Sequence, residues 1–214
     1  MALTRLGPNQ SVNLATNTTG TLGVANGGTG LTSGTTDQLL KFTGSTTLAS
    51  SAIATGKVLQ VQYDNKASTE STSNKATSGS YADVLSVNIT PTASSSTIAI
   101  TAMINTGASS SSDGNCILRL LRDSTQIAGG TASGSRISTT SGRGSENQGA
   151  NSNLMQSVVW MDTPNTTSQV TYKIQFAARG GGSGTAYIGQ TGNDGNNNET
   201  QRTSCHLRLE EIAG

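Results

Sequence analysis

The sequence predicts an all-β protein, an antiparallel β-sandwich of jelly-roll type that follows an extended N-terminal segment. From Lys57 onward, apolar residues recur at every second position in short runs, which is the period of a half-buried strand. Turn-forming residues separate these runs, and no run has the period of a helix. About eight or nine such strands are typical of a sandwich, most simply a jelly roll.

The first expected strand alternates Leu59, Val61 and Tyr63 with glutamines, and the second alternates Leu85, Val87 and Ile89 with polar residues. Further strands are expected around 98–104, 118–120, 126–127, 154–160, 170–176, 187–188 and 205–209. The run 122–125 predicts a hairpin turn, and the pair Pro164-Asn165 predicts a second turn. Long polar loops are expected at 64–80, 133–153 and 180–203.

The length of 214 residues suits one β-domain with an appended segment, divided here into residues 1–56 and 57–214. Only seven residues are aromatic, so the core depends on smaller aliphatic side chains that bury less area. Residues 1–56 are rich in Thr, Ser, Gly and Asn, and cannot bury enough apolar surface alone to become ordered. We therefore expect burial between subunits, with this segment either disordered or wrapped around partner chains.

A glycine-rich motif, VANGGTGLTS, occupies residues 24–33. Together with its surroundings, residues 19–61, it resembles a segment of tailed-bacteriophage fibre and spike proteins that joins an anchoring N-terminus to a distal β-domain. The glycines at Gly27, Gly28 and Gly30 fit tight turns, where a positive φ or a close chain approach excludes a side chain. The resemblance implies a homotrimeric virion appendage whose residues 1–56 bind other virion proteins.

The C-terminal run SCHLRLEEIAG, residues 204–214, is similar to the distal knobs of phage fibres, which in outline resemble the trimeric heads of the tumour-necrosis-factor and complement type. In those knobs the last strand is central and buried. The resemblance implies a tail fibre or spike that adheres to the host cell. A head fibre or decoration protein on the capsid is the alternative with the same fold.

The charge balance of 13 basic and 12 acidic residues lacks the positive surface that nucleic-acid binding uses. No apolar run approaches the ~20 residues that span a bilayer, and the start has no apolar signal region. We therefore expect a protein made in the host cytoplasm without a signal peptide, incorporated into the virion, and not inserted into a membrane. Cys116 and Cys205 are expected as buried thiols, although a disulfide between them stays open.

No constellation of catalytic residues is visible, so we expect no enzyme activity and no cofactor. His206 is the sole histidine, and it alternates with Cys205 and Leu207, which places it on the opposite face of the strand. Glu210 and Glu211 are adjacent, so they face opposite sides and cannot act together on one bond, which disfavours a virion-borne polysaccharide hydrolase. We expect them to be solvated or paired with arginines.

The long loops carry the candidate contacts to a host-surface glycan or protein. One loop contributes Arg136 and Arg143, and the other region contributes Tyr187, Asn193, Asp194, Asn196, Asn198 and Arg202. Amides, carboxylates and one flat aromatic ring are typical of a shallow saccharide site. The run 193–199 also offers oxygen ligands for Ca²⁺, but Asn198 stands where the turn glycine of a calcium loop belongs, so we assign no metal site. Trp160 is expected as a core or intersubunit anchor.

Overall fold

The computed structural model describes residues 29, 34–35, 38–45, 47–52, 56–109, 115–142 and 150–214. The chain divides into two compact units, Met1–Ala54 and Thr55–Gly214. The three glycines assigned to turns, Gly27, Gly28 and Gly30, lie outside the described residues.

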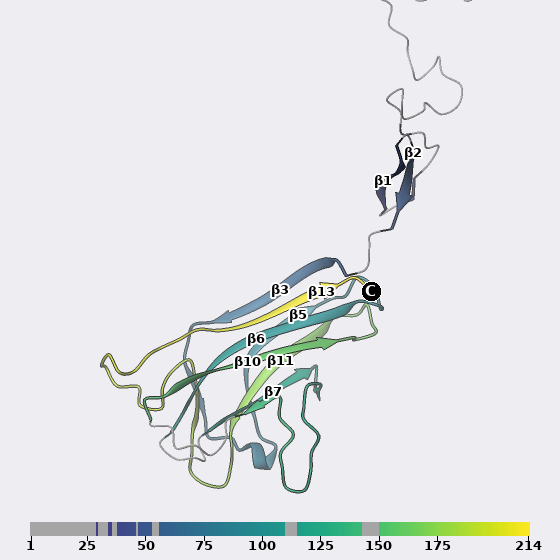
Figure 1. The fold of residues 1–214 in the computed structure, drawn as a ribbon. Coiled ribbons are helices and arrows are strands. Elements are labelled where there is room, and N and C mark those ends of the chain that lie inside the picture. Colours follow the sequence, from purple (N-terminus) through teal and green to yellow (C-terminus); the bar gives the residue numbers. More distant parts are fainter. Residues whose placement is uncertain are drawn as a thin grey trace, which may run out of the picture. The chain divides into compact units, whose positions relative to one another are not determined.

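The second unit is a sandwich of two antiparallel sheets, which confirms the all-β prediction (Figure 1). The first sheet contains, in spatial order, β3 (Val58–Lys66), β13 (Cys205–Ile212), β6 (Thr97–Ala108) and β10 (Asn153–Asp162). Two short strands extend it beside the end of β6, namely β12 (Ala186–Ile188) and β4 (Glu70–Thr72). The second sheet contains β5 (Ala82–Ile89), β11 (Val170–Ala178) and β7 (Cys116–Arg122), followed by β8 (Thr125–Gln126) and β9 (Ser141–Gly142), which both pair with β7.

The pairing of these strands is that of a jelly roll. The first strand of the domain pairs with the last, β3 with β13, and the pairs β5–β11, β6–β10 and β7–β8 are nested inside it along the chain. This is the pattern of one long hairpin folded over into two sheets, and it confirms the expected fold. The last strand, β13, lies between β3 and β6.

The core lies between the two sheets and is built from the inward side chains of strands with a period of two. Its largest fully buried members are Ile89, Ile98, Ile100, Ile104, Leu118, Leu120, Tyr172, Phe176, Ile174, Ile188, Leu207 and Leu209. Cys116 and Cys205 are buried as thiols in the same core. Within the described ranges, no helix is long and apolar enough to cross a bilayer.

Both predicted turns are present, and each contains a non-glycine residue with positive φ. Asp123 has φ of 54° between β7 and β8, and Asn165 has φ of 55° between β10 and β11. Asp and Asn tolerate this conformation better than other side chains. The loop predicted at 64–80 instead contains β4 and a short 3-10 helix, Ala76–Ser78, labelled η2.

Strand β3 forms where it was predicted, but its apolar residues lie on the outer surface of the sandwich. Leu59, Val61 and Tyr63 are exposed, whereas Gln60 reaches a buried carboxylate at the edge of the core. An alternating pattern defines two faces of a strand and does not say which one is covered, and β3 is an edge strand.

Glu211 was expected to be solvated or paired with an arginine, and the structure corrects this expectation. Its side chain is fully buried. The carboxylate accepts hydrogen bonds from Gln60 Nε2 at 2.6 Å and from the backbone N–H and the Oγ1 of Thr92, each at 2.7 Å. Burial raises the pKa of Glu211, but the hydrogen bonds outweigh it and leave the pKa below its ordinary value. The neighbouring Glu210 faces the other side and pairs with Arg208, as predicted.

The described part of the first unit contains one antiparallel hairpin, β1 (Leu39–Gly44) and β2 (Thr47–Ser51). In its register Leu40 is opposite Ser50, and Phe42 is opposite Leu48. These four residues therefore share one face of the hairpin.

Candidate host-contact loop and outer sheet face

The loop between β12 and β13, residues 189–204, is fixed at its base by close backbone contacts. Gly189 has φ of 69° and donates its N–H to the carbonyl of Asn105 at 2.9 Å. A Cβ on Gly192 would lie 2.1 Å from the carbonyl oxygen of Ala108, so only glycine fits there. The base of the loop therefore has little freedom to shift against β6.

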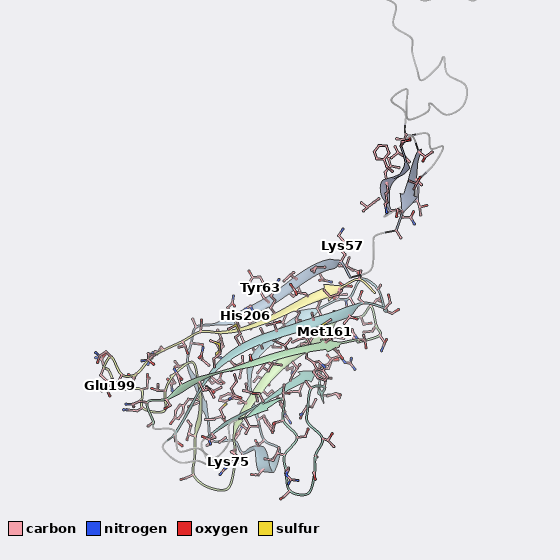
Figure 2. The ribbon with its side chains drawn as sticks, in the orientation of Figure 1. Lys57, Tyr63, Lys75, Met161, Glu199 and His206 are labelled. Carbon is pink, nitrogen blue, oxygen red and sulfur yellow. The ribbon has the colours of Figure 1, made fainter. Side chains whose placement is uncertain are left out.

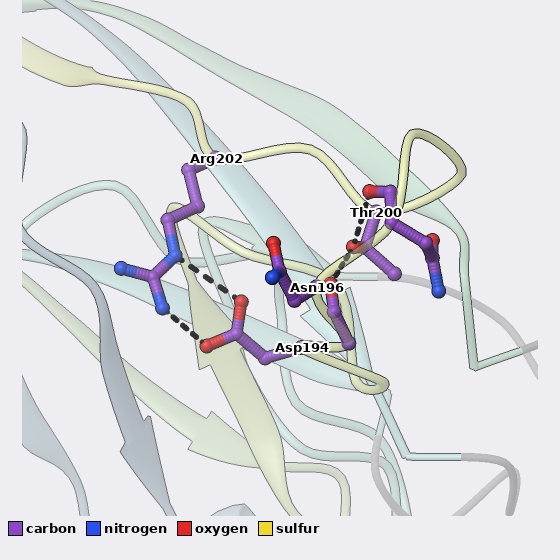
Figure 3. Close-up of a pocket in the computed structure, with 6 residues that line it drawn as sticks. Asp194, Asn196, Thr200 and Arg202 are labelled. Carbon is purple, nitrogen blue, oxygen red and sulfur yellow. Dashed lines mark hydrogen bonds and ion pairs between the residues drawn. The ribbon is translucent and has the colours of Figure 1, made fainter.

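A polar recess of about 500 Å³ opens at the tip of this loop (Figure 3). It is lined by Asp194, Gly195, Asn196, Asn197, Thr200 and Arg202. The guanidinium of Arg202 donates from Nη2 to Asp194 Oδ2 at 2.5 Å and from Nε to Asp194 Oδ1 at 3.2 Å. Hydrogen bonding from Arg202 holds the pKa of Asp194 below its ordinary value. A cation in this recess would need the carboxylate of Asp194 as a ligand, and that carboxylate is already paired with the positively charged guanidinium of Arg202.

Several polar side chains of the loop hold its shape. Asn193 donates from Nδ2 to Oδ1 of Asn151 at 3.0 Å, Thr200 donates to the carbonyls of Gly195 and Asn197, and Asn197 Oδ1 accepts from the N–H of Glu199 at 3.0 Å.

In contrast, Asn196 and Asn198 are exposed, and neither side-chain amide is hydrogen-bonded to another described residue. Their donors and acceptors are therefore open to a ligand without disturbing the loop.

The structure brings together only part of the predicted contact set. Asp194, Asn196 and Arg202 line the recess, and Asn193 and Asn198 lie in the same loop. Sequence reasoning missed Asn197, which belongs to the polar run 193–199 that it singled out, and Thr200, which directly follows that run.

Three further candidates lie elsewhere or outside the described residues. Tyr187 is half-buried on β12, paired with Gly107 and Ser71, and stands outside the recess. Arg136 lies on a separate loop between β8 and β9, where its Nη1 donates to Ser133 Oγ at 3.2 Å. Arg143 is outside the described residues. The predicted aromatic platform is thus absent from the recess itself.

A second recess, of about 450 Å³, adjoins the first through their shared residue Arg202. It is lined by Met103, Asn105, Met155, Arg202, Thr203, Ser204 and His206. His206 is half-exposed with Nδ1 3.0 Å from Asn65 Oδ1, on the face opposite Cys205 and Leu207, as the alternation predicted. Within the described part of the chain, no three His, Cys, Asp or Glu side chains group together as a metal site would require.

The outer face of the first sheet carries several large exposed apolar side chains, among them Tyr63 and Met161, which Figure 2 labels. Its exposed apolar residues are Val61, Tyr63, Met103, Met155, Val159 and Met161, and the register places polar side chains between them, at Asn65, Thr101, Asn105, Ser157, His206, Arg208 and Glu210. Val159 is 75% exposed, Tyr63 66% and Met161 55%. The register aligns them in rows across the strands, with Val159 beside Thr101, Arg208 and Tyr63. Arg208 and Glu210 form an ion pair in the middle of the face.

Strand β10 is apolar on both of its sides. Val158 points into the core and is 3% exposed, while Val159 points outward. Trp160, predicted as a core or intersubunit anchor, is still 41% exposed at the edge of the sheet, and Met161 follows it on the outer face. A strand with apolar side chains on both sides is typical of one that is covered on both faces.

The outer face of the second sheet has the opposite character. There Thr171 donates to Asn88 at 2.7 Å, and Gln175 joins Asp83 and Arg119 through hydrogen bonds of 2.5 and 2.7 Å. A small apolar cluster covers one end of this face, built from Ala76, Ile117, Ala177, Tyr81 and Ile137. Among the described residues, the outer face of the second sheet therefore lacks the large exposed apolar side chains that the first sheet carries.

Comparisons with known proteins give little beyond this geometry. No protein-family model matches the sequence, and no curated protein matches it. Among solved structures, the chain is similar to a chain in the structure of infectious bursal disease virus, Gx strain, at 12% identity and a TM-score of 0.33. The alignment covers 82% of this chain and 41% of the viral chain. Similarity at that TM-score is too low to support an inference about function.

Proposed function

We propose that this chain is a structural virion appendage of a tailed phage, a homotrimeric tail fibre or spike that adheres to the host cell. The large apolar side chains exposed on the outer face of the first sheet are the observation that carries the proposal, because a free monomer would leave them in water. The resemblance of residues 19–61 to phage fibre segments supplies the class of protein. In this proposal residues 1–56 bind other virion proteins, and the chain has no enzymatic role.

The outer face has the size and charge that self-association needs. Four strands about 4.8 Å apart and about 30 Å long present a flat area of roughly 600 Å² per copy, and the protruding side chains add to that area. Specific interfaces bury about 800 Å² per partner, so the face is of the right order. Arg208 and Glu210 neutralise each other at its centre, and copies can therefore meet without net repulsion. The resemblance to trimeric phage knobs makes three copies the proposed number.

Adhesion is assigned to the recess of loop 189–204. The open amides of Asn196 and Asn198, beside the carboxylate of Asp194 and the guanidinium of Arg202, match the hydroxyl groups of a host-surface glycan or the polar groups of a surface protein. The recess contains no aromatic ring, so each site is shallow and individually weak. Three sites per appendage and several appendages per particle add through effective concentration.

The test is immunogold labelling of purified virions with antibody raised against residues 57–214. Label at the tail is the expected result. Label over the head would replace the tail proposal with the alternative of a head fibre or decoration protein. Particles without label would overturn the virion assignment. Cleavage of host polysaccharide by the purified chain would overturn the non-enzymatic assignment.

A further inference from the structure

The hairpin β1–β2 carries large apolar side chains of the kind that are usually buried. Most of its surface is nevertheless exposed to solvent. Leu40 is 50% exposed and Phe42 63% exposed. With Leu48 and Ser50 they form one side of the hairpin, which we call its apolar face. Within the described ranges the hairpin pairs with no third strand. An isolated two-stranded hairpin is marginally stable in water, so this element needs a further surface to pack against.

We infer that the apolar faces of this hairpin from neighbouring copies of the chain pack on one another and form a collar N-terminal to the jelly-roll domain. This inference rests on the self-association proposed above and adds a second, separate contact between the same copies.

The charge distribution of the hairpin fits an identical partner. Lys41 is the one charged residue between Leu39 and Ser51, and it lies on the side opposite the apolar face, paired with Ala49. Copies can therefore bring Leu40, Phe42 and Leu48 together while their lysines stay in solvent. A partner of different sequence would need an equally small, uncharged apolar face. A second copy of the hairpin already carries such a face.

The hairpin is too small to associate alone. Two strands of five or six residues present roughly 200 Å² on one face, far below the ~800 Å² per partner of a stable interface. In the sequence, residues 52–57 separate the end of β2 from the start of β3. Copies joined through their jelly-roll domains would hold their hairpins at an effective concentration of order millimolar. The collar therefore forms only after the domains have associated.

The experiment compares two adjacent serines on opposite sides of the hairpin in the full chain. Ser50→Cys places a thiol on the apolar face, and Ser51→Cys places one on the other side. Each variant is treated with a short bifunctional maleimide at submicromolar protein and run on a denaturing gel, with light scattering on the same sample. The native thiols of Cys116 and Cys205 are buried, and the unmodified sequence controls for their reaction.

The expected result is a trimer by light scattering in both variants, with covalent dimers from Ser50→Cys alone, since each chain carries one reactive thiol and can form one cross-link. A trimer without such cross-links, or with equal cross-linking from Ser51→Cys, would overturn the collar and leave the trimer standing. A monomer by light scattering would overturn both.

A third sample combines Ser50→Cys with Val159→Asp, which places a charge on the outer face of the first sheet. Cross-links should disappear when the domains separate. Their persistence in a chain whose domains no longer associate would overturn the dependence of the collar on the domains.

Discussion

The phenol of Tyr172 donates a 2.7 Å hydrogen bond to Oδ2 of Asp162 and so joins the two sheets of the sandwich at one end. Tyr172 belongs to β11 in the second sheet, and Asp162 ends β10 in the first. The same carboxylate accepts two hydrogen bonds from Nη1 of Arg122 on β7, at 2.9 and 3.1 Å. Burial, followed by this hydrogen bond, raises the pKa of Tyr172 far above its ordinary value, so the phenol remains a donor.

Tyr172→Phe should lower the free energy of unfolding by about 1–2 kcal/mol, because a buried hydrogen bond to a charged group is lost while the ring still packs. Denaturant titration at one fixed protein concentration measures the change. Tyr187→Phe is the matched control, since its half-buried hydroxyl has no hydrogen-bond partner among the described residues; it should change stability by less than about 0.5 kcal/mol. Equal effects of the two substitutions would contradict a role for the Asp162 contact.

The buried carboxylate of Glu211 should make stability depend on acid pH. Its pKa in the folded state lies below the ordinary value of 4.5, so its contribution is present above that pH and is lost as pH falls through the lower folded value. Glu211→Gln should cost about 2–3 kcal/mol at pH 7 and less at pH 3. Thermal unfolding from pH 3 to 7 tests this. Glu199→Gln, in an exposed loop, serves as the control and should follow the parent curve.

Val159→Asp should dissociate the proposed trimer, because three like charges would be buried against an apolar face. Light scattering at micromolar concentration should report a folded monomer, with the unchanged strand signal checked by circular dichroism. Ser86→Asp puts the same charge on the exposed polar face of the second sheet and should leave the assembly intact. A parent chain that is itself monomeric would refute the assignment of the outer face.

Replacing Asn196 and Asn198 together with serine should weaken adsorption to host cells by about tenfold or more, because each lost contact is multiplied over several sites. The melting temperature should stay within about 1 °C, since neither amide holds the loop. Arg136→Ala, on a separate loop, should leave adsorption unchanged. Adsorption equal to that of the parent would remove the recess from the contact surface.

The recess shows what sequence reasoning could reach and what it could not. Asp194 and Arg202 belong to one short segment, so their proximity was predictable from the chain alone. The position of Tyr187 was not, because pairing with Gly107 and Ser71 fixes it on β12 outside the recess. Three-dimensional contacts also decide which side-chain amides are free to bind a ligand. The amide of Asn193 donates a hydrogen bond to Asn151, whereas the amide of Asn196 has no partner among the described residues.

The sequence by itself determined the long strands of the jelly roll, two of its turns and the alternation of their side chains, whereas β4 and β9 lie in stretches predicted as loops. These features are local: the two-residue period of β11 and β13, and the tolerance of Asp123 and Asn165 for positive φ, depend on neighbours in the chain. The tertiary structure decided which face of each strand is covered. Gln60 rather than Val61 points to the buried carboxylate of Glu211, and Val159 remains in solvent, because coverage depends on where the second sheet lies.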